Sequence, residues 1–111
     1  MKNTIFLSEA LNEMIEAAQF YETQSPGLGQ DFLLEIYSVK EKITKSPMIW
    51  AELEPGIRRC LATKFPYALL YHIDEEDITM TSVMHLKRRP NYWRERLRKR
   101  KRRGNQNSYN N

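Results

Sequence analysis

The residues best suited to chemistry are arginines, one histidine and one tyrosine near the ends of predicted strands. Cleaving RNA without a metal ion requires a base for the 2′-hydroxyl proton, cations for the developing phosphorane charge, and an acid for the leaving oxygen. Arginine suits the second task because its planar guanidinium makes two hydrogen bonds to a phosphate. A histidine can be base or acid near neutral pH, and a tyrosine can orient a base by stacking or offer its hydroxyl. The candidate catalytic set is Arg59, His85, Arg88, Arg89 and Tyr92.

A second group of cations is suited to holding a target or a nucleic acid rather than to catalysis. Lysine and arginine contact phosphates without reading a base sequence. This group comprises Arg58, Lys64, Lys87, Arg94, Arg96 and Arg98. Strand alternation sends Arg58 and Arg59 to opposite faces, so at most one reaches a working surface, and the other can pair with a helix carboxylate.

Several of these residues also have a purely structural interpretation. A histidine at a strand end, such as His85, is more often structural or simply exposed than catalytic. His72 lies within an apolar run and is expected in the core or at a sheet edge. Tyr92 and Trp93, beside Pro90, can simply pack the terminal segment onto the sheet.

The charge of the chain is divided unevenly along its 111 residues. Residues 1–86 carry 7 Lys and Arg against 13 Asp and Glu, a balance of 7 − 13 = −6, whereas residues 87–103 carry 11 against one, a balance of 11 − 1 = +10. Such a basic segment attracts polyanions or an acidic partner. Residues 1–97 are expected to form one domain, followed by a flexible tail, residues 98–111, that is first basic and then polar. The basic run either binds phosphates or is a solvated tail whose charge is neutralised only in a complex.

The composition gives little support to proteins that depend on disulfides, metal ions or membrane attachment. The single cysteine, Cys60, excludes an internal disulfide and is expected to be a small strand residue rather than a nucleophile. Asp74 to Asp77 is expected to be an acidic hairpin turn rather than a metal site. We expect no metal and no cofactor. Without a signal peptide or an apolar run of about 20 residues, we expect a cytoplasmic protein with no membrane partner.

The first half of the chain predicts a strand and two helices. Residues 4–7 are β-branched and aromatic, and Ser8 is expected to be the N-cap of the helix that follows. Apolar residues at spacings of three and four predict one buried face on each helix. The first face comprises Leu11, Met14, Ile15, Ala18 and Tyr21, and the second comprises Leu28, Phe32, Leu33, Ile36, Tyr37 and Ile43. The break at Ser25-Pro26-Gly27 predicts an antiparallel hairpin, with the second helix ending near Ser46-Pro47.

The second half predicts a loop and three strands. Residues 48–56 contain Pro55 and Gly56 and are expected to be a loop. Residues 57–63, 67–73 and 78–85 are expected to form an antiparallel meander, because their connections are short. Residues 91–103 can form a short helix opened by Pro90.

Five stretches, in one order and at matching spacings, resemble the RelE/ParE superfamily of toxins, in particular its ParE-like plasmid stabilization branch. The stretches are Glu13-x-x-x-Ala17-Ala18-x-x-Tyr21; Ser25-Pro26-Gly27-Leu28-Gly29 with Phe32-Leu33-x-Glu35; Ile57-Arg58-Arg59; Phe65-Pro66-Tyr67-x-x-x-Tyr71; and His85-x-x-Arg88-Arg89-x-Pro90-x-Tyr92-Trp93-x-x-Arg96. The similarity covers residues 4–96. It implies an α+β fold of order βααβββ: a helical hairpin on a twisted, mainly antiparallel four-stranded sheet, with a basic C-terminal helix or tail.

The resemblance also implies a growth-arresting toxin of a type II toxin–antitoxin module, covered by a cognate antitoxin in a hetero-oligomer. ParE-like toxins inhibit DNA gyrase, and RelE-like toxins cleave messenger RNA in the ribosome without a metal ion. RelE-like enzymes supply several cations along the middle strands, whereas this chain offers only Arg58, Arg59 and Lys64 there. The sequence therefore favours gyrase inhibition over endoribonuclease activity. A third hypothesis is a non-catalytic nucleic-acid-binding protein that acts through its basic tail.

Overall fold

The computed structural model describes residues 2–88 and 92–97. Two helices, α1 (Ser8–Gln24) and α2 (Leu28–Lys45), follow the first strand, β1 (Asn3–Phe6). Four strands come after them: β2 (Glu52–Glu54), β3 (Ile57–Leu61), β4 (Tyr67–Ile73) and β5 (Asp77–His85). The predicted tail, residues 98–111, lies outside the described residues.

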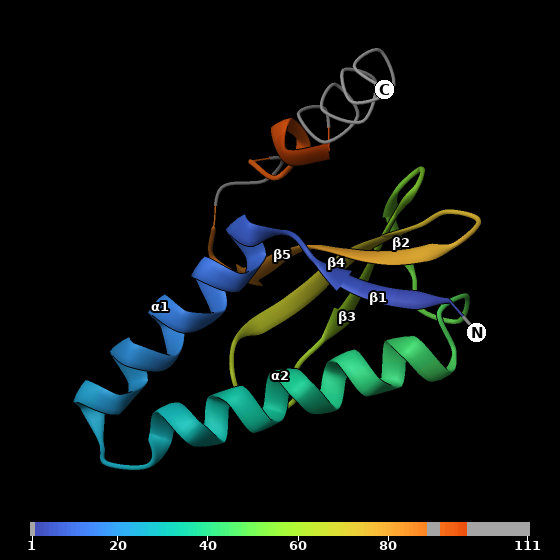
Figure 1. The fold of residues 1–111 in the computed structure, drawn as a ribbon. Helices are drawn as coiled ribbons and strands as arrows, with labels where there is room; N and C mark the ends of the chain where they lie inside the picture. Colours follow the sequence, from blue (N-terminus) through green and yellow to red (C-terminus); the bar gives the residue numbers. More distant parts are fainter. Residues whose placement is uncertain (1, 89–91, 98–111) are drawn as a thin grey trace, which may run out of the picture.

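The strands form one sheet in the order β1-β5-β4-β3-β2. β1 runs parallel to β5, and every other neighbouring pair is antiparallel. Figure 1 shows α1 and α2 joined in a hairpin on one side of the sheet, with residues 92–97 (orange) away from α2 at the far end of α1. This arrangement confirms the predicted α+β class and its helical hairpin.

The sheet has five strands rather than the predicted four, because β2 forms where a loop was expected. Its three residues are too few for an alternating pattern to be recognised in the sequence. Gly56, with a φ of +86°, makes the tight turn that lets β2 fold back on β3. β3 also ends at Leu61, so Thr63 lies beyond the strand.

The two faces of the sheet have separate cores. The helix-covered face is filled mainly by apolar side chains of α1, α2, β3, β4 and β5, among them Phe32, Ile36, Cys60, Leu69 and Tyr71. The opposite face, which we call the second face, carries a smaller cluster of Ile57, Ala68, Leu70, Met84 and Trp93. Strand alternation explains the division, because Cys60 and Ile57 of β3 lie in different clusters.

Some predicted details of the helices are wrong. α1 begins at Ser8 itself, its N-cap is Leu7 without a side-chain hydrogen bond, and the Ser8 hydroxyl donates instead to Glu9. Four predicted core residues are exposed: Leu11, Ile15, Leu33 and Tyr37. The other predicted core residues include four that are buried: Ala18 on α1 and Phe32, Ile36 and Ile43 on α2. The buried faces also contain residues that were not predicted, namely Ala10, Ala17, Gly29 and Val39. Spacings of three and four fit two neighbouring apolar stripes on each helix, and only one of the two stripes can face the sheet.

Two structural predictions for single residues are confirmed. Cys60 is buried in β3, and burial raises the pKa of its thiol, as expected for an unreactive side chain. The Asp74 carboxylate accepts hydrogen bonds from the backbone N–H groups of Glu76 and Asp77, which closes the acidic turn between β4 and β5 and lowers the pKa of Asp74. None of the helices in the described part of the chain is long and apolar enough to cross a bilayer.

Candidate functional site

A cleft of about 290 Å³ opens on the second face and gathers three arginines. Arg59 reaches it from β3, Arg88 from the turn after β5, and Arg94 from the C-terminal segment. Its remaining lining comprises Leu53, Glu54, Met84 and Leu86. Because Glu54 accepts a hydrogen bond from Arg94 Nε at 3.0 Å, the positive charge left in the cleft comes from the other two arginines.

Arg59 and Arg88 differ in how they are held. Among the described residues no carboxylate pairs with the exposed Arg59. Arg88 Nη1 lies 3.7 Å from a carboxylate oxygen of Glu13, and its side chain is 52% exposed. Both guanidinium groups, which belong to the predicted catalytic set, can therefore meet an anion from solvent.

His85 lies on the other face of the sheet from Arg59. It lines a separate cavity of about 240 Å³ with Glu13, Glu16, Ala17, Phe20, Tyr67, Val83 and Arg88. Its ring packs edge-on against Tyr67, with centroids 5.0 Å apart. Arg88 lines both cavities and so links the two sides at the end of β5.

The position of the His85 ring is fixed by a local hydrogen bond. The backbone N–H of Lys87 donates to His85 Nδ1 at 3.0 Å. In the neutral ring the proton then resides on Nε2, so the lone pair that would accept a substrate proton is already engaged. His85 is therefore poorly arranged as a general base.

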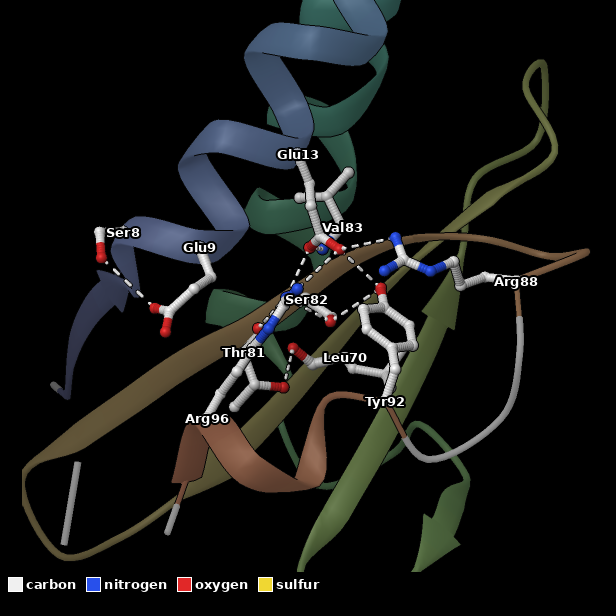
Figure 2. Close-up of polar contacts among 10 residues, drawn as sticks. All are labelled: Ser8, Glu9, Glu13, Leu70, Thr81, Ser82, Val83, Arg88, Tyr92 and Arg96. Atoms are coloured by element: carbon white, nitrogen blue, oxygen red, sulfur yellow. Dashed lines mark hydrogen bonds and ion pairs between the residues drawn. The ribbon is translucent and has the colours of Figure 1, made fainter. Parts of the chain in front are cut away.

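A buried carboxylate on α1 organises the residues around Tyr92. Glu13 Oε1 accepts hydrogen bonds from Arg96 Nη1 at 2.7 Å and from the backbone N–H of Val83 at 3.0 Å. Glu13 Oε2 accepts from Tyr92 at 2.8 Å and from Arg96 Nη2 at 3.0 Å. We call Glu13, Ser82, Tyr92, Arg96 and Arg88 the Glu13 cluster (Figure 2).

The backbone explains why these polar groups gather at this point. β1 ends at Phe6, which pairs with Met80, so no strand of the described residues lies beside β5 on that edge from Thr81 onward. Buried backbone groups must still be paired. The carboxylate of Glu13 accepts from the Val83 N–H, and Arg96 donates to the Thr81 carbonyl at 3.1 Å. The cluster thus completes the sheet edge with side chains.

Tyr92 is held too firmly to exchange its proton easily. Its hydroxyl donates to Glu13 and receives a hydrogen bond from Ser82 at 3.1 Å. Burial raises the pKa of Tyr92 to about 12, with the Glu13 carboxylate adding to the shift while the Ser82 hydrogen bond and the charge of Arg96 oppose it. The guanidinium carbons of Arg88 and Arg96 lie 4.0 Å and 4.8 Å from the ring centroid, within cation–π range.

The remaining predicted site residues are scattered. Arg58 donates to the carbonyls of Met48 and Trp50 and pairs with Glu52 of β2, rather than with a helix carboxylate. Lys64 lines a different cavity, of about 530 Å³, against α2. Lys87 is exposed in the turn after β5. Arg96 is engaged within the Glu13 cluster. The predicted residues Arg89 and Arg98 lie outside the described residues.

Glu13 and Ser82 were given no role from the sequence. Glu13 does carry a usable signal: it stands three residues after Ala10 and four before Ala17, both buried. A carboxylate in that register lies at the border of the buried helix face and needs a partner. Ser82 offers no comparable signal. Among the described residues no group of His, Cys, Asp and Glu could hold a metal ion. The exposed arginines of the second-face cleft are suited to binding anions.

The described residues form an α+β fold, with two helices packed on a five-stranded, mainly antiparallel sheet. Among solved structures, the chain is similar to one from the "Chromosomal ParDE TA system from P. aeruginosa", with a TM-score of 0.59 over 77% of this chain and 96% of that chain. The two sequences are 11% identical, so the likeness concerns the fold. No family model matches the sequence, and no curated protein matches it significantly.

Proposed function

We propose that this protein is the toxin of a type II toxin–antitoxin module and that it arrests bacterial growth by binding DNA gyrase, without covalent chemistry of its own. The likeness to a chain of a ParDE system supports the toxin class. The cleft with Arg59 and Arg88 supplies a cationic contact surface for the target.

The observation that carries this choice is the state of the two candidate proton-transfer groups. Metal-free RNA cleavage needs a base and an acid that can exchange protons with the substrate. Tyr92 has its hydroxyl engaged by Glu13 and its pKa raised to about 12, and His85 accepts the Lys87 N–H at Nδ1. Arg59 and His85 also line different cavities. These features favour a binding surface over a nuclease site.

The cognate antitoxin is proposed as the cytoplasmic partner that covers this surface. The cleft combines the exposed cations Arg59 and Arg88 with the apolar walls Leu53, Met84 and Leu86. An acidic segment that also carries apolar side chains would complement both features. The adjacent gene in the genome is the first candidate, and its product should protect cells that express the toxin.

A supercoiling assay with purified gyrase tests the proposal. The wild-type chain should block supercoiling, and added antitoxin should restore it. The Arg59→Ala/Arg88→Ala variant should inhibit at least tenfold less well, since each hydrogen bond to a charged group at an interface contributes roughly 1.5–3 kcal/mol. Lys45→Ala, which removes an exposed cation at the end of α2, is the matched control and should inhibit normally. Undiminished supercoiling at excess wild-type toxin would refute gyrase as the target.

Cells that express the toxin allow the nuclease hypothesis to be distinguished from gyrase inhibition. Primer extension on translated messages should show no new cuts during arrest. Cuts that disappear in Arg59→Ala/Arg88→Ala would replace gyrase inhibition with RNA cleavage. A variant lacking residues 98–111 should keep at least part of the arrest, whereas complete loss would favour a nucleic-acid-binding protein acting through the tail.

A further inference from the structure

Two cations share one aromatic ring in the Glu13 cluster. Arg88 and Arg96 both lie against Tyr92, with guanidinium carbons 4.0 Å and 4.8 Å from the ring centroid. Two like charges held against one ring repel, and partial burial strengthens the repulsion. The Glu13 carboxylate contacts both guanidinium groups and offsets this repulsion. The ring alone would not hold both.

The carboxylate holds these two arginines unequally. Arg96 makes a bidentate pair with Glu13, and its side chain is 14% exposed. Arg88 lies 3.7 Å from Glu13 Oε2, makes no shorter contact to it, and is 52% exposed. If the negative charge were removed, Arg88 would be the first to leave, because solvent can replace its contacts.

We propose that Glu13 is a positioning residue for target binding: its carboxylate holds the Arg88 guanidinium on Tyr92, at the junction of the two cavities at the end of β5. Fixing the C-terminal segment through Arg96 is then only half of its role. The proposal rests on the proposed function, in which Arg88 contacts the target, and it adds a residue that itself stays out of the interface.

The expected effect follows from the cost of ordering a long side chain. A free arginine samples many rotamers, and immobilising it on binding lowers affinity. A guanidinium already held by Glu13 and Tyr92 has lost much of this freedom before the target arrives. Replacing Glu13 by glutamine should therefore weaken target binding about threefold to tenfold.

The first experiment observes Arg88 directly and requires no target. Order parameters of the arginine Nε–H groups are measured by ¹⁵N relaxation in the full-length wild type, Glu13→Gln and Ser82→Ala. Ser82→Ala removes hydrogen bonds to Tyr92 and Arg96 but leaves Glu13 facing Arg88. Arg88 should become mobile in Glu13→Gln and stay ordered in Ser82→Ala. Equal order of Arg88 in all three proteins would overturn the proposal.

The second experiment is a double-mutant cycle on gyrase affinity with Arg88→Ala. If Glu13 acts through Arg88, the Glu13→Gln change should alter affinity less than about twofold once Arg88 is alanine. A residue that only supports the fold would weaken binding by the same factor in both backgrounds, which would overturn the proposal. Should Glu13→Gln unfold, Glu13→Gln/Arg96→Gln replaces it, because an amide pair leaves no unpaired buried charge.

The two experiments separate failure of this inference from failure of the proposed function. If Arg88→Ala leaves gyrase affinity unchanged, Arg88 is not a target contact and the positioning role of Glu13 is refuted, whereas gyrase inhibition fails only if the wild-type chain leaves supercoiling undiminished. If Arg88→Ala weakens binding but the cycle is additive, the target surface stands and the positioning role of Glu13 is refuted. Loss of Arg88 order together with a non-additive cycle supports it.

Discussion

The two faces of the sheet are built by different means. The helix-covered face is filled mainly by apolar side chains from two long helices and several strands, with Phe32 and Tyr71 fully buried. The second face has a small apolar cluster closed by Trp93, from the six described residues 92–97. A polar cluster around Glu13 ties that short segment to α1 and β5 (Figure 2).

Because of this difference, the helix-covered face supplies most of the stability, whereas the second face carries the proposed target surface. Of the exposed cations of the proposed target surface, Arg88 lies in the turn before the short segment and Arg59 on β3, and neither lies on the helical hairpin. A segment of a few residues buries little surface, so detaching it from the sheet costs less free energy than unfolding the whole protein. The target surface should thus be easier to disrupt than the fold. The following substitutions test this contrast.

The largest effects should come from removing the main aromatic side chain on each face. Phe32→Ala opens a cavity in the helix-covered core and should lower the free energy of unfolding by about 3 to 5 kcal/mol. Trp93→Ala removes the buried ring that closes the second-face cluster. It should release residues 92–97 while the helices and sheet remain folded. Urea denaturation followed by circular dichroism measures the global effect.

Limited trypsin digestion distinguishes the two variants under native conditions. Trp93→Ala should be cut rapidly after Arg94 or Arg96, because the released segment is open to protease. Phe32→Ala should be cut there at the wild-type rate at temperatures where it stays folded. Protection of Arg94 and Arg96 in Trp93→Ala would mean that the polar cluster alone retains the segment.

The next effect compares two arginines of the same segment. Arg96→Met leaves the nearly buried Glu13 carboxylate without its bidentate partner, and should cost about 3 kcal/mol. Arg94→Met breaks an exposed pair with Glu54, and should cost less than about 1 kcal/mol. Thermal unfolding of both variants measures the difference, and equal losses would contradict the central role of Glu13.

The sequence predicts the framework of the fold because periodic patterns have many repeats to average over. Both helices and four of the five strands follow from such patterns or from strand-forming residue types, and Ser25-Pro26-Gly27 marks the hairpin break. β2 does not, since three residues carry no pattern. The exposed Leu11 and Ile15 were misassigned because spacing alone does not say which of two apolar stripes faces the sheet.

The candidate site was predictable in part, for a similar reason. The arginines that line the second-face cleft stand out by type and position, and Arg59 and Arg88 were both selected. The Glu13 cluster joins residues 83 positions apart in the chain, as in the Glu13–Arg96 pair. No local pattern encodes such a contact. It depends on where β1 ends and leaves the edge of β5 open.

A smaller effect tests how closely the helices pack on their own face. A side chain at Gly29 would overlap the carbonyl oxygen of Ala18 on α1. Gly29→Ala should therefore push the helices apart and cost about 1 to 3 kcal/mol, despite the higher helix propensity of alanine. Since this change lies far from the second face, gyrase inhibition by the folded fraction should be unaltered. Weaker inhibition per folded molecule would mean that the two faces are coupled.

The smallest effect concerns two tyrosines, one on each face, whose hydroxyls lose their protons only at high pH, so that stability at neutral pH is not affected. Burial raises the pKa of Tyr71, whose hydroxyl donates to Pro47, and of Tyr92 to about 12 each. Because both pKa values exceed the unfolded value near 10, the folded state binds these protons more tightly. Their stabilisation is complete below pH 10 and is lost as the pH rises toward 12. Absorbance at 295 nm should show two late phenolate transitions, with Tyr71→Phe and Tyr92→Phe each removing one. A Tyr92 transition near pH 10 would mean that residues 92–97 detach from the second face before the core unfolds. The contacts of Glu13 would then hold this segment less firmly than the structure implies.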